Sequence, residues 1–176
     1  MKPIRLLLVV VCVWFTLAAV SCRRSPAEPP PTGGPGPSAM ELNWVGGLSL
    51  ASTKVIWTNR SLSLQKSSAW LQFQGKEGTV TITPSPAAWE AFWQRMEKVK
   101  VWDWQPRYVN PHVMDGLTWT VKLVHGDQRV SVVGINSYPG DGDVRQELDQ
   151  PGKVYNDYLK AVAELLGRPL WEADER

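Results

Sequence analysis

Residues that most often form metal sites and nucleophiles are scarce in this chain, which has two cysteines and two histidines among 176 residues. His112 follows Pro111 and His125 precedes Gly126, and neither has a second ligand at metal-binding spacing. A zinc site needs three or four suitable ligands. The sequence therefore predicts no metal site.

Local catalytic signatures are also missing. The sequence has no Gly-x-Ser-x-Gly elbow and no glycine-rich loop leading from a strand into a helix, so a hydrolase or a phosphate-bearing cofactor has no motif to support it. The acidic stretch from Asp141 is not a calcium loop, because position 5 is Arg145 and position 12 is Gly152. We predict no cofactor, no catalytic residues and no enzyme activity, although a Ser-His-Asp set needs no local motif and stays open.

The N-terminus has the pattern of an export signal. Lys2 and Arg5 precede a run from Leu6 to Val20 without charge. A basic start, a short apolar run and small residues at its end are typical of a signal peptide. The run is shorter than the roughly 18 residues of a spanning helix. Residues 1–21 are therefore predicted to be a signal peptide.

The end of this segment, Ala19-Val20-Ser21-Cys22, resembles the lipobox of bacterial lipoproteins, with Ser21 and Cys22 matching. The resemblance implies diacylglycerol on the Cys22 thiol, cleavage before it, and acylation, as by palmitate, of the new N-terminus. Several acyl chains hold a protein stably at a bilayer. Arg23 stands where an aspartate would imply inner-membrane retention, so the expected location is the outer membrane in a Gram-negative cell. A conventional cleavage nearby, or an uncleaved anchor, is the alternative.

Residues 22–41 are predicted to be the lipidated cysteine and a flexible linker. Proline and glycine dominate this stretch, and such a composition cannot bury enough apolar surface to fold. Extended at about 3.1 Å per residue, it would reach roughly 50 Å from the bilayer. Because Cys12 would leave with the signal peptide, the mature chain would have one modified cysteine and no internal disulfide.

The remaining residues, 42–176, have a typical single-domain length. Without Lys2 and Arg5 the chain has 17 basic and 17 acidic side chains, and its net charge is zero. No basic patch or stripe is visible in the sequence. Since nucleic-acid binding usually needs one, we expect no nucleic-acid partner.

Alternating apolar residues predict about six strands, at residues 54–57, 61–64, 69–74, 79–83, 117–123 and 130–135. Ser85-Pro86 opens a predicted helix with an apolar stripe from Trp89 to Val99. A second helix is predicted from about Val154 to Leu166, ended by Gly167. One apolar face per element predicts an α+β fold: an antiparallel sheet with two helices packed on one face.

Ten tryptophans are the compositional anomaly. The most distinctive stretch contains Trp-x-Trp at 102–104, Asp-Gly-x-x-Trp at 115–119 and Gly-x-Asn-x-Tyr-Pro at 134–139. It resembles an uncharacterised bacterial domain, over about residues 89–167, which implies a fold and no catalytic residues. The possible ligand-contact residues are Trp102, Trp104, Asp115, Asn136 and Tyr138. Core packing and loop structuring are the competing interpretation of this cluster.

The leading functional hypothesis is a membrane-anchored lipoprotein that binds another envelope protein, a polysaccharide or an extracellular ligand without catalysis. The alternative is an inhibitor of a secreted or envelope hydrolase that presents a loop such as Asn136 to Asp143. An enzyme is the third and least expected possibility. Exposure of Trp102, Trp104 and Tyr138 together in a groove would favour a ligand site, and their burial would favour a scaffold.

Overall fold

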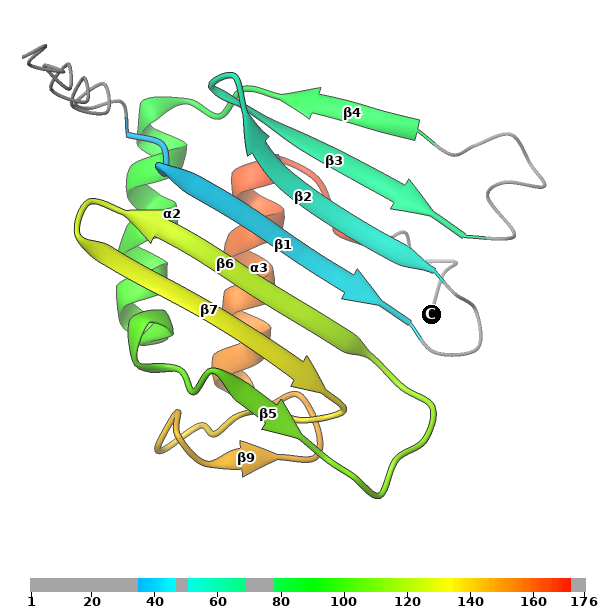
Figure 1. The fold of residues 1–176 in the computed structure, drawn as a ribbon. Helices are drawn as coiled ribbons and strands as arrows, with labels where there is room; N and C mark the ends of the chain where they lie inside the picture. The colour runs from blue at the N-terminus through cyan, green and yellow to red at the C-terminus, as the bar shows by residue number, and fades with distance from the viewer. Residues whose placement is uncertain (1–34, 47–50, 69–77, 172–176) are drawn as a thin grey trace, which may run out of the picture. The chain divides into compact units, whose positions relative to one another are not determined.

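The computed structural model describes residues 35–46, 51–68 and 78–171, which form an α+β fold (Figure 1). The first half of the fold contains β1 (Ala39–Val45), β2 (Ser52–Thr58), β3 (Ser61–Ser67) and β4 (Gly78–Ile82), followed by helix α2 (Pro86–Lys98). A short helix and three strands follow: η1 (Val101–Asp103), β5 (Arg107–Val109), β6 (Thr118–His125) and β7 (Gln128–Ile135). The last elements are β8 (Tyr138–Pro139), β9 (Glu147–Leu148) and helix α3 (Lys153–Leu166).

The main sheet has seven strands in the order β4-β3-β2-β1-β6-β7-β5, and only the β5–β7 pair is parallel. Strand β1 joins the β1–β4 meander to the β6–β7 hairpin. In the antiparallel β1–β6 pair, Ala39 lies opposite Val124 and Val45 lies opposite Thr118. The chain therefore enters the sheet at the end where the β6–β7 turn lies. Strands β8 and β9 form a separate two-stranded ribbon.

Both helices pack on the same face of the sheet, and Figure 1 shows them together behind it. On β1 and β2, residues of this face contact the helices: Trp44 packs on Tyr158 of α3 and Trp57 packs on Trp89 of α2. Alternate residues of the central strands are buried on this side, as period-two patterning requires. The predicted packing of the helices on one face agrees with these contacts.

The local signals that predicted the helices are present in the structure. Ser85 Oγ accepts a hydrogen bond from the Ala88 amide at 3.2 Å, and Pro86 is the first residue of α2. Gly167 ends α3 in the left-handed conformation, with φ of 65°. Gly126, with φ of 57°, forms the predicted turn between β6 and β7.

The sheet differs from the prediction in three places. It has seven strands where about six were expected, because β1 and the short β5 were not anticipated. The strand predicted at 69–74 falls outside the described residues. The linker predicted to extend through residue 41 overlaps β1, which begins at Ala39, and the Ser38 amide already donates to the Val124 carbonyl. The folded part therefore begins before the predicted boundary at Leu42, because backbone pairing with β6 orders a segment whose composition is that of a linker.

The predicted signal peptide and Cys22 lie outside the described residues. Among the described helices, none has both the length and the apolar composition needed to cross a bilayer.

Candidate functional site

Two of the predicted ligand-contact residues, Trp104 and Tyr138, lie in the core. Their side chains are only 5% and 6% exposed. Both pack against Trp119 and Tyr155: the Trp104 ring centroid lies 5.9 Å from that of Trp119, and the Tyr138 centroid lies 4.8 Å from that of Tyr155. The structure therefore favours the packing interpretation for these two rings.

Hydrogen bonds inside the domain also engage the indole N–H groups of this aromatic cluster. Trp104 Nε1 donates to the Val99 carbonyl at 3.1 Å, and Trp119 Nε1 donates to the Ser137 carbonyl at 3.1 Å. Trp44 Nε1 donates to the Tyr155 hydroxyl at 3.0 Å. Burial raises the pKa of Tyr138, and it raises the pKa of Tyr155 well above its ordinary value of 10.0. The cluster is thus a closed part of the core that holds α3 against the sheet.

Trp102 lies in a different, half-buried place, on the side of α2. Its Nε1 donates to Glu97 Oε1 at 2.7 Å, and its ring stacks on Trp93 with a centroid separation of 6.2 Å. Trp93 in turn stacks on His125 at 4.0 Å and donates its Nε1 to the Pro35 carbonyl at 2.7 Å. Both indole N–H groups are therefore already engaged, and both side chains are half-buried.

Asn136 and the turn before β6 do lie together, as expected from the hairpin. Asn136 adopts a left-handed conformation, with φ of 52°, which asparagine tolerates better than most residues. Its Nδ2 donates to the Val113 carbonyl at 3.1 Å, and its own amide donates to the Leu117 carbonyl at 3.0 Å. A Cβ at Gly116 would lie 1.7 Å from Asn136 Oδ1. This contact explains why glycine follows Asp115 in the motif.

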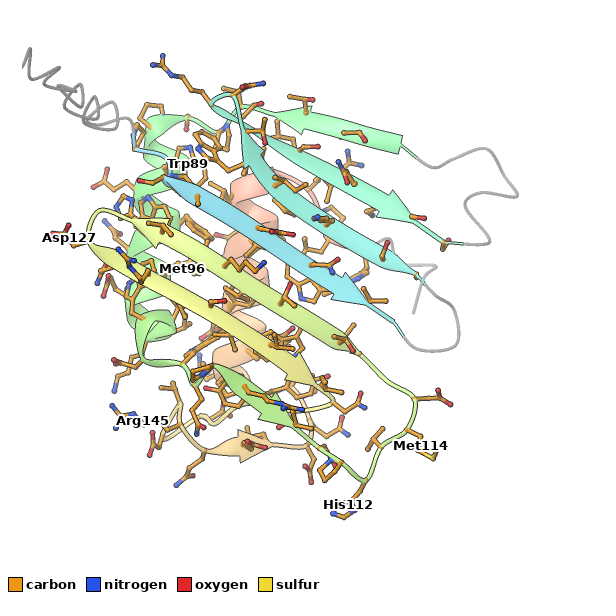
Figure 2. The ribbon with its side chains drawn as sticks, in the orientation of Figure 1. Trp89, Met96, His112, Met114, Asp127 and Arg145 are labelled. Atoms are coloured by element: carbon orange, nitrogen blue, oxygen red, sulfur yellow. The ribbon has the colours of Figure 1, made fainter. Side chains whose placement is uncertain are left out.

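The segment held by Asn136 is the loop of residues 110–117, hereafter the Met114 loop. Its start is fixed because Asn110 Nδ2 donates to Asp149 Oδ1 at 3.0 Å and Asn110 Oδ1 accepts from the His112 amide at 2.9 Å. Its tip is the most exposed apolar part of the described residues: Met114 is 98% exposed and Val113 is 42% exposed. Figure 2 shows Met114 and His112 pointing away from the sheet.

The Met114 loop lies at the end of the sheet opposite to the chain entry. It leads into Thr118 of β6, which pairs with Val45 at the end of β1, whereas Ala39 at the start of β1 pairs with Val124. Asp127, in the β6–β7 turn, marks the entry end, and Figure 2 shows it far from Met114. The two ends of the sheet thus have different roles: one receives the N-terminal segment and the other carries the exposed loop.

The stretch from Asn136 to Asp143, expected as a presented loop, is mostly internal. Its first five residues, through Gly140, are buried, and only the last three are exposed. Asp141 Oδ1 accepts from the Val154 amide at 2.8 Å and so caps α3, whose N-cap residue, Gly152, has no side chain to do so. This stretch therefore supports the core and α3, and the presented loop is the Met114 loop.

Within the described part of the chain, no group of three or more His, Cys, Asp or Glu side chains could hold a metal ion. In comparisons with known proteins, the chain matches no family model and no curated protein sequence. The exposure of Met114 was not anticipated from the sequence. The available signal was the apolar pair Val113-Met114 directly before the Asp-Gly turn, where neither strand nor helix periodicity gives it a buried face.

Proposed function

We propose that this protein is a lipid-anchored envelope protein whose folded domain is a non-catalytic interaction module, and that it contacts a partner protein through the Met114 loop. One observation carries the second part of the proposal: a wholly exposed methionine at the tip of a loop that hydrogen bonds fix at its start and middle.

A side chain such as Met114 suits insertion into an apolar pocket of another protein. Methionine is flexible and polarizable and fills pockets of varied shape. Because Asn110 and Asn136 already hold the loop, little conformational entropy is lost when a partner binds it. Anchors of this kind, buried at the centre of an interface, carry most of the binding free energy.

The anchor is proposed from the N-terminal sequence, in which Cys22 follows a short apolar run with a basic start. The fold supports this arrangement of anchor and contact surface. A tether attached before β1 meets the sheet at the end near Asp127, which leaves the Met114 loop at the free end. Acylation at Cys22, in a Gram-negative outer membrane or another bacterial membrane, would hold the module at the bilayer surface.

A protein partner is favoured over a polysaccharide. Sugar recognition would use exposed aromatic faces, but the Trp104 and Tyr138 rings are buried and the Trp93 and Trp102 rings stack on each other. The exposed feature is instead a single flexible apolar side chain, which suits a protein pocket.

A second candidate function, inhibition of a secreted or envelope hydrolase, is favoured by the same loop. An inhibitor that blocks a cleft needs a protruding segment whose conformation is set before binding. The Met114 loop has this property, with its polar bonds directed back into the domain and its apolar side chain directed outward.

Site-specific photo-crosslinking in the native cells tests the proposal. The full chain would carry benzoylphenylalanine in place of Met114, with Asp127 replaced in the same way as the matched control at the other end of the sheet. We expect one discrete protein adduct at position 114 and none of the same mass at position 127. The absence of an adduct at position 114, or the same adduct in equal yield at positions 114 and 127, would contradict the proposal.

The identity of the adduct separates the two candidate functions. If the crosslinked protein is a hydrolase, the purified full-length chain should lower the turnover of that hydrolase. The Met114→Asp chain, tested in the same way, should leave the turnover unchanged. If it is a structural or transport protein, Met114→Asp should abolish the complex and no turnover is involved. A charged residue at this position would have to be desolvated on binding, which is costly.

A further inference from the structure

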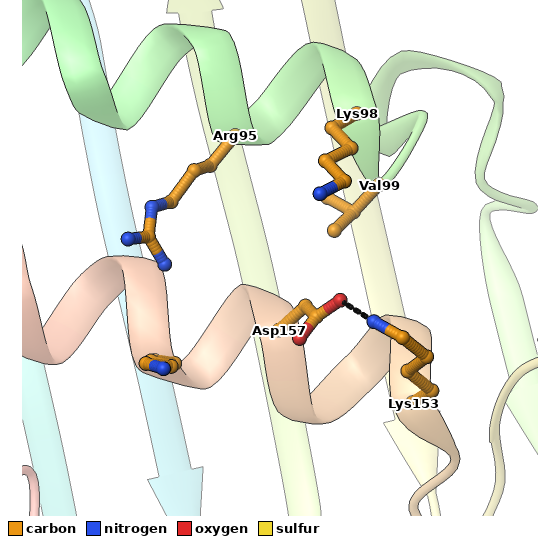
Figure 3. A pocket seen from close by; sticks show the side chains of 6 residues that line it. Arg95, Lys98, Val99, Lys153 and Asp157 are labelled. Atoms are coloured by element: carbon orange, nitrogen blue, oxygen red, sulfur yellow. Dashed lines mark hydrogen bonds and ion pairs between the residues drawn. The ribbon is translucent and has the colours of Figure 1, made fainter.

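A groove lined by basic side chains runs between α2 and α3, on the side of the helices away from the sheet (Figure 3). Its volume is about 320 Å³, roughly ten times the share of a water molecule in the liquid. The two helices are antiparallel here, so that the end of α2 lies beside the start of α3. The lining residues are Arg95, Lys98, Val99, Lys153, Asp157 and Lys160.

The charges in this groove are unbalanced. Arg95 pairs with Glu164 at 2.5 Å, and Lys153 pairs with Asp157 one helical turn away. The hydrogen bond from Lys153 is the largest cause that lowers the pKa of Asp157. This carboxylate is therefore ionised and already paired with Lys153. Among the described residues, no ion pair or hydrogen bond engages Lys98 or Lys160, although the charges of both contribute to lowering the pKa of Asp157.

This local excess contrasts with the chain taken as a whole, in which basic and acidic side chains balance once Lys2 and Arg5 are set aside. Two unpaired ammonium groups on facing helices, beside a guanidinium, attract a small anion with several acceptor oxygens. A phosphate can accept from donors on both helices at once, whereas a carboxylate offers two oxygens.

We infer that this groove binds a phosphate group, held mainly by Lys98 and Lys160. The inference is independent of the Met114 loop, which lies on another part of the molecule. Two sources share this chemistry: the headgroup of a phospholipid and a soluble phosphate compound. Asp157 sets the position of the anion, because its negative charge keeps the phosphate toward the two unpaired lysines.

Titration of the full chain in maltoside micelles with inorganic phosphate, at constant ionic strength, tests this inference. Backbone amide shifts would be followed by NMR. We expect saturable shifts confined to residues 95–99 and 153–160. The double variant Lys98→Ser/Lys160→Ser should bind at least about tenfold more weakly. Asp157→Asn should bind more tightly, because it removes the negative charge of a carboxylate that lines the groove.

The matched control is Lys54→Ser/Lys122→Ser, which removes the same charge from the opposite face of the sheet, where both lysines pair with Glu41. Its affinity should stay within about twofold of the parent. Two results would overturn the inference by showing charge screening only: amide shifts that do not saturate with phosphate, or a loss of phosphate affinity in the control variant equal to that in Lys98→Ser/Lys160→Ser.

Short-chain phospholipids then distinguish the two sources. Dihexanoyl phosphatidic acid would be compared with dihexanoyl phosphatidylcholine, whose headgroup has no net charge. If the acid shifts the same amides and the choline lipid does not, the groove recognises a membrane headgroup. If inorganic phosphate binds and neither lipid does, the ligand is a soluble phosphate compound. No binding of phosphate or of either lipid would overturn the inference.

Discussion

At the scale of single residues, the abundance of tryptophan is explained by packing. Among the described residues, four tryptophans are buried. Three of them contact the tyrosines of α3, and Trp89 packs instead on aromatic rings of α2 and β2. The hydrophobic core stabilises this domain, and aromatic side chains bury the most area per residue. The buried tryptophans are Trp44, Trp89, Trp104 and Trp119.

Two neighbouring tyrosines of α3 provide a test of this core. The Tyr158 hydroxyl is buried and has no hydrogen-bond partner among the described residues, whereas the Tyr155 hydroxyl accepts from Trp44. An unsatisfied buried hydroxyl is destabilising. Tyr158→Phe should therefore raise the free energy of unfolding by about 1 kcal/mol, and Tyr155→Phe should lower it by about 1–2 kcal/mol. Urea denaturation measures both values, and a loss in the Tyr158 variant equal to that in the Tyr155 variant would contradict the assignment.

Close packing against Trp119 explains why glycine stands at position 134, in the Gly-x-Asn motif. A Cβ at Gly134 would lie 1.9 Å from Trp119 Cε2, the ring of the residue paired with it across the sheet. Gly134→Ala should lower the free energy of unfolding by about 3 kcal/mol, because the indole has to move within the core. Gly142, which has nothing within 4 Å of its added Cβ, is the control. Gly142→Ala should change the same quantity by less than about 0.5 kcal/mol.

At the scale of elements, the helices were predictable because their signals are local. Ser85, Pro86 and Gly167 mark their ends, and each helix carries one apolar stripe. Strand β1 was not predicted, because it follows a proline-rich stretch and its pairing with β6 joins residues far apart in the chain. Strand β5 has three residues and follows Pro106, so it has no detectable period.

The candidate contact surfaces were harder to predict than the elements. Trp104 and Tyr138 were predicted as possible ligand contacts, whereas the structure buries both rings against Tyr155, and this packing depends on the placement of α3. The basic groove requires α2 and α3 to lie antiparallel, and no pattern within either helix indicates this. The periodicity of a sequence indicates which face of a single helix or strand is buried. These sites are formed by two or more elements that pack together, so periodicity does not predict them.

At the scale of elements, we predict how substitutions of Asn136 change the stability of the domain and the mobility of the Met114 loop. Asn136→Gly tolerates the positive φ but loses the hydrogen bond to the Val113 carbonyl. Asn136→Ala loses the same hydrogen bond and also places a less tolerant residue in the left-handed conformation. The free energy of unfolding should fall by about 1 kcal/mol for glycine and by about 2–3 kcal/mol for alanine. Amide hydrogen exchange of residues 112–116 should be faster in both variants.

Met114→Ala is the control for this series, since the side chain is almost wholly exposed. Its unfolding free energy should stay within about 0.5 kcal/mol of the parent value. Equal stability of the glycine and alanine variants would show that the backbone conformation at Asn136 is not left-handed in solution.

At the scale of the whole molecule, all four tyrosines of the chain report on folding. Burial is the largest cause that raises the pKa of each of them: Tyr108, Tyr138, Tyr155 and Tyr158. Below pH 10 the hydroxyls are protonated in both the folded and the unfolded state, so they add no pH dependence. Above it the unfolded chain loses protons first, and the free energy of unfolding falls as the pH rises.

Alkaline titration checks this statement. Tyrosinate absorbance should stay low as the pH passes 10.0, the ordinary pKa of tyrosine, and should then rise together with the loss of the near-ultraviolet circular dichroism. Under urea, the same chain should titrate near the ordinary value. Ionisation of any tyrosine at its ordinary pKa in the folded chain would contradict the burial described above.

The central claim is that one covalent modification, at Cys22, holds this module at a bacterial membrane. Metabolic labelling of cells with alkyne-palmitate tests it most directly, with the Cys22→Ser chain as control. The account predicts a labelled parent chain in the membrane fraction, and a Cys22→Ser chain that is unlabelled and leaves that fraction. An unlabelled parent chain, or a serine variant with unchanged fractionation, would contradict it.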